Sequence, residues 1–363
     1  MATAPRQAAG WMREEPLFVA GAGGYHTYRI PALAVTRSGA LLAFCEGRRD
    51  SRADYGQIDL LLRRSQDGGA TWTDVQVIAS EAGRTCGNPA PVVDRATGRI
   101  VLTFCQNLAE GGEDLICAGQ APRTVWLTHS ADVGATWSPP TEITASVKRP
   151  EWTWYATGPG HGIQLTGGRL LVPCDHMVGV AFARSADPQH SHAILSDDGG
   201  ATWRLGGIVP EGTNESTAVE LSDGTVVINC RNRRGGGHAR LVARSTDGGE
   251  TFGAFRRDEA LVEPVCQASL ARLGAGHEVL FSNPASLARE NLTVRLSADG
   301  CRSWAAQRTV YAGAAAYSDL AVLPDGTICC LYERGVASPY EEIALARFDR
   351  AWLVRAGGPA TAH

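Results

Sequence analysis

Three arginines lie beside the ends of strand-like runs in three different repeats of this sequence: one precedes the first strand of a hairpin, one ends a second strand and one follows a second strand. They are Arg29, Arg231 and Arg289. A single arginine is most often a solvated surface charge. The planar guanidinium group is, however, well suited to multidentate capture of a carboxylate. Three arginines at strand ends in three different repeats therefore predict a carboxylate-binding clamp, provided that the fold brings them together.

A tyrosine and several acids lie at similar points in other repeats. Glu215 and Tyr317 each come just before a hairpin, Asp54 lies in the loop that follows Arg48, and Glu333 ends the last hairpin. Each acid alone would be an ordinary turn residue. A tyrosine with two acids beside an arginine clamp forms a set that general acid–base and nucleophilic chemistry can use.

The elements that must position these residues are marked by a repeated eight-residue sequence, S-x-D-x-G-x-T-W. Its five copies are Ser65–Trp72, Ser130–Trp137, Ser196–Trp203, Ser245–Phe252 and Ser297–Trp304. The Asp can accept backbone N–H groups of its own turn, and the Gly supplies a positive φ. The aromatic residue can wedge between neighbouring sheets. Cys301 takes the Gly position in the fifth copy, so we expect that turn to depart locally from the geometry of the other four.

Each copy of this eight-residue sequence is called an Asp box below. A second repeat, made of a strand, a turn and a strand, occurs six times between the Asp boxes. Its copies are Ile30–Val35 with Ala40–Cys45, Pro91–Val93 with Ile100–Cys105, Gly162–Leu165 with Arg169–Pro173, Ala218–Leu221 with Thr225–Asn229, Ser269–Leu273 with Glu278–Ser282, and Leu320–Leu323 with Thr327–Tyr332. Gly-centred turns join the strands, which is typical of hairpins. Six hairpins, each followed by a further strand, predict an all-β, six-bladed β-propeller of four-stranded antiparallel sheets. We expect an N-terminal lead-in at residues 1–20 and a single propeller domain at 21–363.

With its Tyr-Arg-Ile-Pro motif at residues 28–31 and its repeated Asp boxes, the chain resembles the sialidases (exo-α-neuraminidases) of the six-bladed propeller superfamily. The resemblance covers residues 28–348. It implies a clamp for the substrate carboxylate, made of Arg29, Arg231 and Arg289. It also implies that Glu333 orients the first of these arginines, and that Arg48 and Asn88 lie near the sugar ring.

The resemblance further assigns Tyr317 as the nucleophile, Glu215 as its general base and Asp54 as the acid/base. A carboxylate nucleophile would be repelled by the carboxylate on the anomeric carbon of sialic acid, whereas a neutral phenol avoids that repulsion. Because a phenol is a poor nucleophile at its usual pKa, it needs a nearby base. We therefore expect a retaining exo-α-sialidase that acts on sialylated glycans through a sialyl-tyrosine intermediate.

Composition excludes several other classes of function. The net charge of −4 and the scattered basic clusters argue against nucleic-acid binding, and apolar runs are too short for a membrane span. Residues 1–11 lack the apolar region of a secretory signal, so we expect a cytoplasmic protein with reduced, buried cysteines. The nine histidines show no metal-ligand spacing. We expect no metal, no cofactor and a monomer.

Several alternatives stay open at this stage. A non-catalytic propeller that binds sialosides could keep the same scaffold, although Tyr317, Glu215 and Asp54 are all present. A trans-sialidase would need aromatic residues on the acceptor side, for which Trp152, Trp154 and Tyr155 are available; packing inside a Trp-rich segment is an equal reading of these three. A hydrolase that prefers the deaminated sugar is also compatible with the motifs.

Overall fold

Almost all of the regular secondary structure is β-strand, as the hairpin pattern predicts. The computed structural model describes residues 10–179, 189–233 and 238–355. Its three helices are short: α1 (Glu113–Cys117), α2 (Thr144–Val147) and α3 (Arg350–Val354). In this part of the chain, every helix is too short to cross a membrane.

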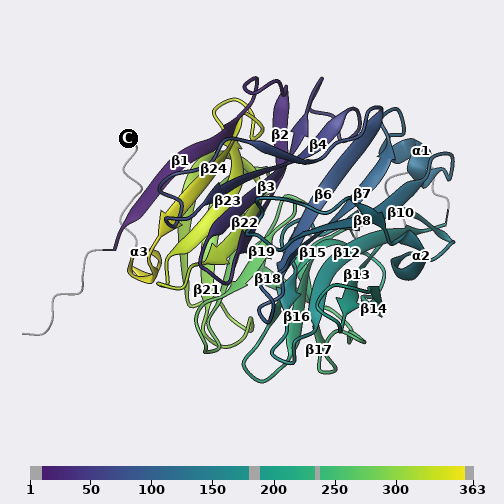
Figure 1. Ribbon diagram of the computed structural model, residues 1–363. Coiled ribbons are helices and arrows are strands. Elements are labelled where there is room, and N and C mark those ends of the chain that lie inside the picture. Colours follow the sequence, from purple (N-terminus) through teal and green to yellow (C-terminus); the bar gives the residue numbers. More distant parts are fainter. Residues whose placement is uncertain (1–9, 180–188, 234–237, 356–363) are drawn as a thin grey trace, which may run out of the picture.

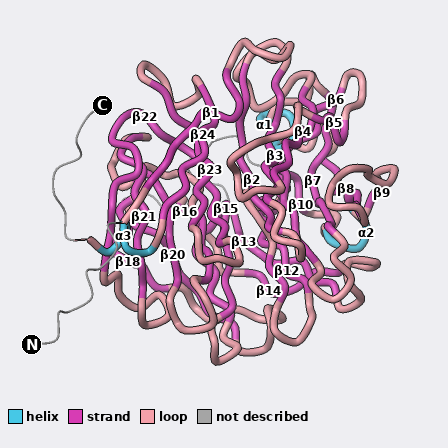
Figure 2. The backbone as a smooth tube through the Cα atoms, turned by 60° about the vertical axis from the view of Figure 1, so that its left-hand side comes forward, coloured by secondary structure: helices cyan, strands magenta, loops and turns pink. Residues whose placement is uncertain are grey.

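The strands run through the molecule with loops at both ends (Figures 1 and 2). The strands of the first half are β1 (Met12–Val19), β2 (Thr27–Val35), β3 (Leu41–Arg48), β4 (Ile58–Ser65), β5 (Gln76–Ala79), β6 (Arg84–Val93), β7 (Ile100–Leu108), β8 (Arg123–Ser130), β9 (Thr141–Glu142), β10 (Trp152–Thr157), β11 (Ile163–Gln164) and β12 (Leu170–Val178). The strands of the second half are β13 (Gln189–Ser196), β14 (Arg204–Ile208), β15 (Thr213–Glu220), β16 (Val226–Asn232), β17 (Ala239–Ser245), β18 (Arg256–Val262), β19 (Ser269–Arg272), β20 (Val279–Pro284), β21 (Glu290–Ser297), β22 (Ala306–Val322), β23 (Ile328–Gly335) and β24 (Glu342–Phe348).

All six predicted hairpins are present and antiparallel. The pairs are β2–β3, β6–β7, β11–β12, β15–β16, β19–β20 and β22–β23. The strand that precedes each Asp box then pairs antiparallel with the second strand of its hairpin, as β4 does with β3 and β17 with β16. The order β15-β16-β17-β18 shows the resulting four-stranded sheet most simply.

The first strands of the hairpins contact one another in sequence order. Strand β2 contacts β6, β6 contacts β11, β11 contacts β15, β15 contacts β19 and β19 contacts β22; β22 then contacts β2 again. The long strand β22 joins two sheets, because it pairs first with β21 and then with β23. The first strands therefore surround a common axis, at which residues distant in sequence can meet.

Strand β1 lies within the segment that the sequence predicts to be a lead-in, yet it pairs antiparallel with β24 at the edge of the last sheet (Figure 1). Leu17 and Phe18 are buried, and Glu15 forms an ion pair with Arg347 at 3.1 Å. The N-terminal end of the described chain thus completes the sheet built by its C-terminal strands. Residues 1–9 of the predicted lead-in lie outside the described residues.

The hydrophobic core is divided into clusters that lie between sheets. Adjacent cysteines of β23 illustrate this: Cys329 belongs to a cluster with Leu33 and Leu41, whereas Cys330 belongs to one with Leu292 and Val294. Their side chains therefore face opposite sides of one strand, as the period of a β-strand predicts. All ten cysteines are free thiols, and nine of them are buried.

The five Asp boxes form the same turn. In the second box, the Asp132 carboxylate accepts hydrogen bonds from the Thr136 amide at 2.9 Å and the Thr136 hydroxyl at 2.6 Å, and Gly134 N donates to Ser130 Oγ at 2.9 Å. The aromatic residue then packs on the preceding sheet, as Trp137 does edge-on against Phe44 with ring centroids 6.0 Å apart. The boxes thus join neighbouring sheets at their outer ends.

The fifth box keeps this geometry despite its departure from the pattern. Cys301 adopts φ 63°, its N–H donates to Ser297 Oγ at 2.8 Å, and Ser303 donates to Asp299 from both its amide and its hydroxyl. Cys301 packs in a buried cluster with Phe281. The local departure expected from the sequence is therefore absent, and this box places a non-glycine residue in the left-handed region, where side chains are disfavoured.

The box hydrogen bonds make a testable prediction about acid stability. Hydrogen bonds from Thr136 and Ser130 lower the pKa of Asp132 to about 2. Because this folded pKa lies below the unfolded value of about 3.9, the stabilisation is complete above that value and is lost as the pH falls towards 2. Asp132→Asn should lower the Tm at pH 7, and the difference from the parent protein should shrink at about pH 3. The exposed Asp74→Asn is the control; an Asp132→Asn effect that is independent of pH would contradict this account.

Candidate active site

The first strand of several hairpins contains a bulge at the same end of the fold. Register shifts occur between Arg29 and Ala32 in β2, between Gly87 and Ala90 in β6, between Thr213 and Ser216 in β15, and between Ala315 and Ser318 in β22. Bulges bend a strand and redirect its side chains. The shifted segments contain Ile30, Asn88, Glu215 and Tyr317, and all four side chains line one cavity.

This cavity has a volume of about 260 Å³ and lies where the first strands meet. Eight of the nine predicted site residues line it: Arg29, Arg48, Asp54, Asn88, Glu215, Arg231, Arg289 and Tyr317. The ninth, Glu333, is fully buried and bonded to Arg29. The fold thus brings together all the residues that the sequence singles out, although their roles stay predictions.

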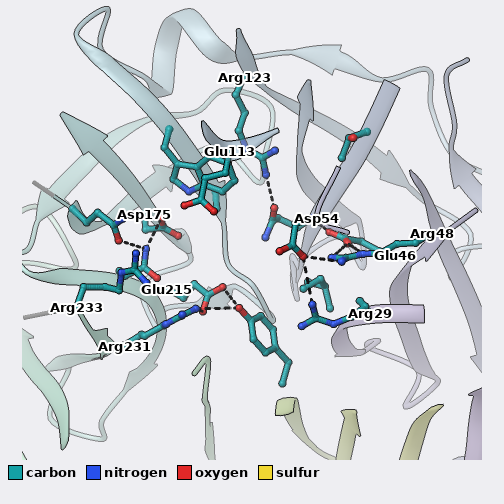
Figure 3. A pocket seen from close by; sticks show the side chains of 18 of the residues that line it. Arg29, Glu46, Arg48, Asp54, Glu113, Arg123, Asp175, Glu215, Arg231 and Arg233 are labelled. Carbon is teal, nitrogen blue, oxygen red and sulfur yellow. Dashed lines mark hydrogen bonds and ion pairs between the residues drawn. The ribbon is translucent and has the colours of Figure 1, made fainter. Parts of the chain in front are cut away.

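Tyr317, Glu215 and Arg231 form one hydrogen-bonded group that lines the cavity; Figure 3 labels Glu215 and Arg231. The Tyr317 hydroxyl donates a short hydrogen bond to Glu215 Oε1, and Arg231 Nη1 donates to Glu215 Oε2 at 2.7 Å and to the Tyr317 oxygen at 3.2 Å. Burial and the Glu215 charge raise the pKa of Tyr317 well above its usual value, against the opposing effect of Arg231 and Arg289. The resting side chain is therefore a neutral phenol whose proton already points at a carboxylate.

The other two arginines of the predicted clamp flank the same tyrosine. The guanidinium carbon of Arg29 lies 5.1 Å from the Tyr317 ring centroid, and that of Arg289 lies 5.5 Å from it. Arg289 also donates to the Tyr340 hydroxyl at 2.7 Å. Three guanidinium groups therefore surround one phenol ring, which concentrates positive charge at this end of the cavity.

Glu333 holds two of these segments in place. Its carboxylate accepts from Arg29 Nε at 2.8 Å and Nη2 at 3.2 Å, and from the backbone amides of Ile30 at 2.9 Å and Tyr317 at 3.1 Å. The side chain is 0% exposed. A single buried carboxylate therefore orients Arg29 and, through the two backbone amides, stabilises the bulges of both β2 and β22.

Asp54 lies opposite this group on the loop after β3. Its carboxylate is 2.7 Å from Arg48 Nη1 and 3.4 Å from Arg29 Nη1, and its side chain is 69% exposed. Partial desolvation raises the pKa of Asp54, but the Arg48 and Arg29 charges outweigh this effect and hold the pKa below its usual value. Arg48 is in turn held by Glu46 through Nε at 2.9 Å and Nη2 at 2.7 Å.

The rest of the cavity is lined by eleven further residues, of which the sequence analysis considered only Trp154 for a role at the site. They are Ile30, Glu46, Thr85, Glu113, Arg123, Trp154, Ala156, Asp175, Gln189, Asn214 and Arg233. Most are polar or charged. The repeat itself could have indicated some of these residues. The same position in the second strand of four hairpins is occupied by Glu46, Asp175, Arg231 and Glu333. The first three of these residues directly follow a buried cysteine, at positions 45, 174 and 230.

Of the three aromatic residues considered for an acceptor site, Trp154 alone lines the cavity. Its ring lies 4.2 Å from the guanidinium carbon of Arg123. Trp152 and Tyr155 are buried in the core between two sheets, where the Tyr155 hydroxyl hydrogen-bonds His192 at 3.1 Å. The packing interpretation is therefore correct for Trp152 and Tyr155.

Comparison with known proteins identifies the family. Residues 39–330 match the BNR repeat-like domain. The chain is 36% identical to a sialidase from Micromonospora viridifaciens, and the match covers 94% of this chain and 54% of the relative. It is also 36% identical to an exo-alpha-sialidase from Aspergillus fumigatus, and that match covers 76% of this chain and 69% of the relative. The solved Hadza microbial sialidase Hz136 superposes with a TM-score of 0.85 at 29% identity, over 94% of this chain and 69% of that one. The chain thus spans about half of its Micromonospora relative and about two thirds of the other two proteins. The match in fold, in sequence and in BNR repeats shows that this chain belongs to the sialidase family.

Proposed function

We propose that the protein is a retaining exo-α-sialidase that releases terminal sialic acid from glycoconjugates through a covalent sialyl-tyrosine intermediate. The observation that carries this proposal is the Tyr317 hydroxyl, which donates to Glu215 inside a group of three arginines. A carboxylate nucleophile would be repelled by a substrate carboxylate bound at these arginines. A neutral phenol with an adjacent base avoids that repulsion.

The arginine group supplies binding and orientation. A substrate carboxylate held by Arg29, Arg231 and Arg289 would lie beside the Tyr317 ring, which places the adjoining anomeric carbon near the phenol oxygen. Because Glu333 fixes both Arg29 and the backbone of Tyr317, the distance between clamp and nucleophile is set before substrate binds. Such preorganisation lowers the cost of reaching the transition state.

Proton transfer would be divided between two carboxyl groups. Glu215 takes the phenol proton as Tyr317 attacks, while Asp54 protonates the departing glycosidic oxygen and later activates water. In the free protein Arg48 and Arg29 favour the ionised form of Asp54. A substrate carboxylate at Arg29 would offset part of that positive charge, which raises the pKa of Asp54 and favours the protonated acid that the first step needs.

The six hairpin units support a second part of the proposal, namely that they are the six blades of one closed propeller. In this arrangement β1 would complete the last blade and the cavity would lie on the central axis. Monomeric state, cytoplasmic location and the absence of a cofactor stay predictions.

The alternatives differ in what they release. A trans-sialidase transfers the sugar to an acceptor glycan, and a non-catalytic propeller releases nothing. An assay of free and transferred sugar from α2,3-, α2,6- and α2,8-linked sialosides, with the deaminated sugar included, separates them. Free sialic acid as the main product supports the proposed function, and binding without release contradicts it.

The nucleophile is tested by trapping the intermediate with a fluorinated sialosyl inhibitor. We expect mass spectrometry of peptides to locate the adduct on Tyr317, and Tyr317→Phe to form none. Glu215→Gln should slow adduct formation by about 10²–10⁴-fold but leave Tyr317 as its site, because only the base is lost. Tyr311→Phe, a hydroxyl outside the cavity, is the control. An adduct on Glu215 or Asp54 in the parent enzyme would overturn the assignment.

The role of Asp54 is tested through the leaving group. The lactose of sialyllactose is a poor leaving group as an alkoxide and needs a proton in the transition state, whereas an aryl leaving group of low pKa barely needs one. Asp54→Ala should therefore reduce kcat/KM for sialyllactose by about 10²–10⁴-fold and spare an activated aryl sialoside in part. Asp50→Ala, in the same loop, should affect neither substrate. If Asp54→Ala slows both substrates by the same factor, Asp54 does not act as the acid.

A further inference from the structure

Asp175 is a buried acid at the cavity to which the proposed mechanism assigns no role. It lies on β12, is 0% exposed and lines the cavity across from Arg29 and Arg48 (Figure 3). Its position in the repeat matches that of Glu46, Arg231 and Glu333, whose side chains all serve the site. This repeat position thus supplies a side chain to the site in at least three other hairpins.

The two carboxyl oxygens of Asp175 have different surroundings. Oδ2 accepts a hydrogen bond from Asn214 Nδ2 at 3.1 Å, and Asn214 also donates to Gln189 Oε1 at 2.8 Å. Oδ1 is buried and has no hydrogen-bond partner among the described residues. Leaving a buried polar atom without a hydrogen-bond partner is energetically costly. Because Asp175 lines the cavity, a ligand bound there could supply the missing partner.

The charge state of Asp175 decides what that partner is. Burial and the Glu215 charge raise the pKa of Asp175 well above its usual value, against the weaker opposing effect of Arg123 and Arg231. Glu113 on α1 adds a further negative charge, and the directly paired neighbours, Ala156 on β10 and Ser191 on β13, do not titrate. These influences favour the neutral form of the side chain. Since Oδ2 accepts from Asn214, the proton belongs on Oδ1.

We propose that Asp175 is a substrate-binding residue that donates a hydrogen bond from Oδ1 to an oxygen of the sugar on the side of the ring away from the clamped carboxylate. This rests on the proposed sialidase function and deepens it, because it assigns part of the specificity for the sugar. The oxygen is a hydroxyl or an acyl carbonyl, and the polar lining by Asn214 and Gln189 fits either.

Two substitutions separate hydrogen bonding from packing. Asp175→Leu keeps the approximate size and removes the donor, whereas Asp175→Asn can accept from Asn214 through its oxygen and donate to the ligand through its amide. The measurement is the Kd of the 2,3-unsaturated sialic acid analogue by calorimetry. We expect Leu to weaken binding by roughly three- to tenfold and Asn to restore most of it. Asp94→Asn, a buried acid in the β6–β7 turn, should change nothing.

The pH dependence gives an independent readout. Loss of the Asp175 proton removes the donor, so the parent protein should lose affinity relative to Asp175→Asn as the pH rises through the Asp175 pKa. Taking the ratio of the two Kd values removes the pH effects that the two proteins share. A ratio that stays constant from pH 5 to pH 9, together with an unchanged Kd for Asp175→Leu, would overturn the proposal. Equal losses for Leu and Asn would also overturn it, because they indicate a packing role.

Analogues identify the oxygen. The effect of Asp175→Leu should vanish for whichever analogue lacks the contacted group: the deaminated sugar, the 4-deoxy sugar or the sugar with a shortened side chain. If every analogue keeps the full effect, no sugar oxygen is the partner. A parent protein that binds the analogue without hydrolysing sialosides would contradict the hydrolase proposal alone, since the Kd test of Asp175 would still be decided.

Discussion

The site depends on the carboxylate of Glu333, which is buried without contact with solvent and accepts four hydrogen bonds. An unpaired charge in such a place would be strongly destabilising, so Arg29 and Glu333 require each other. Two of the four donors are backbone amides in the bulges of β2 and β22. Glu333 therefore connects the first hairpin to the last and sets the position of Arg29 relative to Tyr317.

Two other buried glutamates also bond both to an arginine side chain and to a backbone amide. Glu46 holds Arg48 with one oxygen and the backbone amide of Asn88 with the other, at 2.8 Å. Glu263 pairs with the fully buried Arg240 and accepts from the amide of Asn232 at 2.8 Å. Each acid joins a guanidinium group to an irregular strand segment or strand end. Irregular backbone at the cavity is thus held by ion pairs, while the Asp boxes hold the turns at the opposite ends of the sheets.

Local patterns predicted the hairpins and the site residues, but they did not predict what depends on register. Turn residues and alternation are local properties, so all six hairpins could be found from the sequence. The bulges that aim Glu215 and Tyr317 arise only when two strands pair, and the burial of Trp152 and Tyr155 arises only when two sheets pack. Strand β1 was missed because its charged residues look like a solvated segment until Arg347 supplies a partner for Glu15. Asp175 could have been found by aligning the second strands of the repeats.

The coupling through Glu333 is measured most directly by a double-mutant cycle on kcat/KM for an aryl sialoside. The variants are Glu333→Gln, Arg29→Lys and the pair together, each checked for an unchanged fold by circular dichroism. If Glu333 acts by orienting Arg29 and the Tyr317 segment, each single change should cause a large loss, and the double variant should lose little more than the worse single one. Losses that simply add would show that the two residues act independently and would contradict this account of the site.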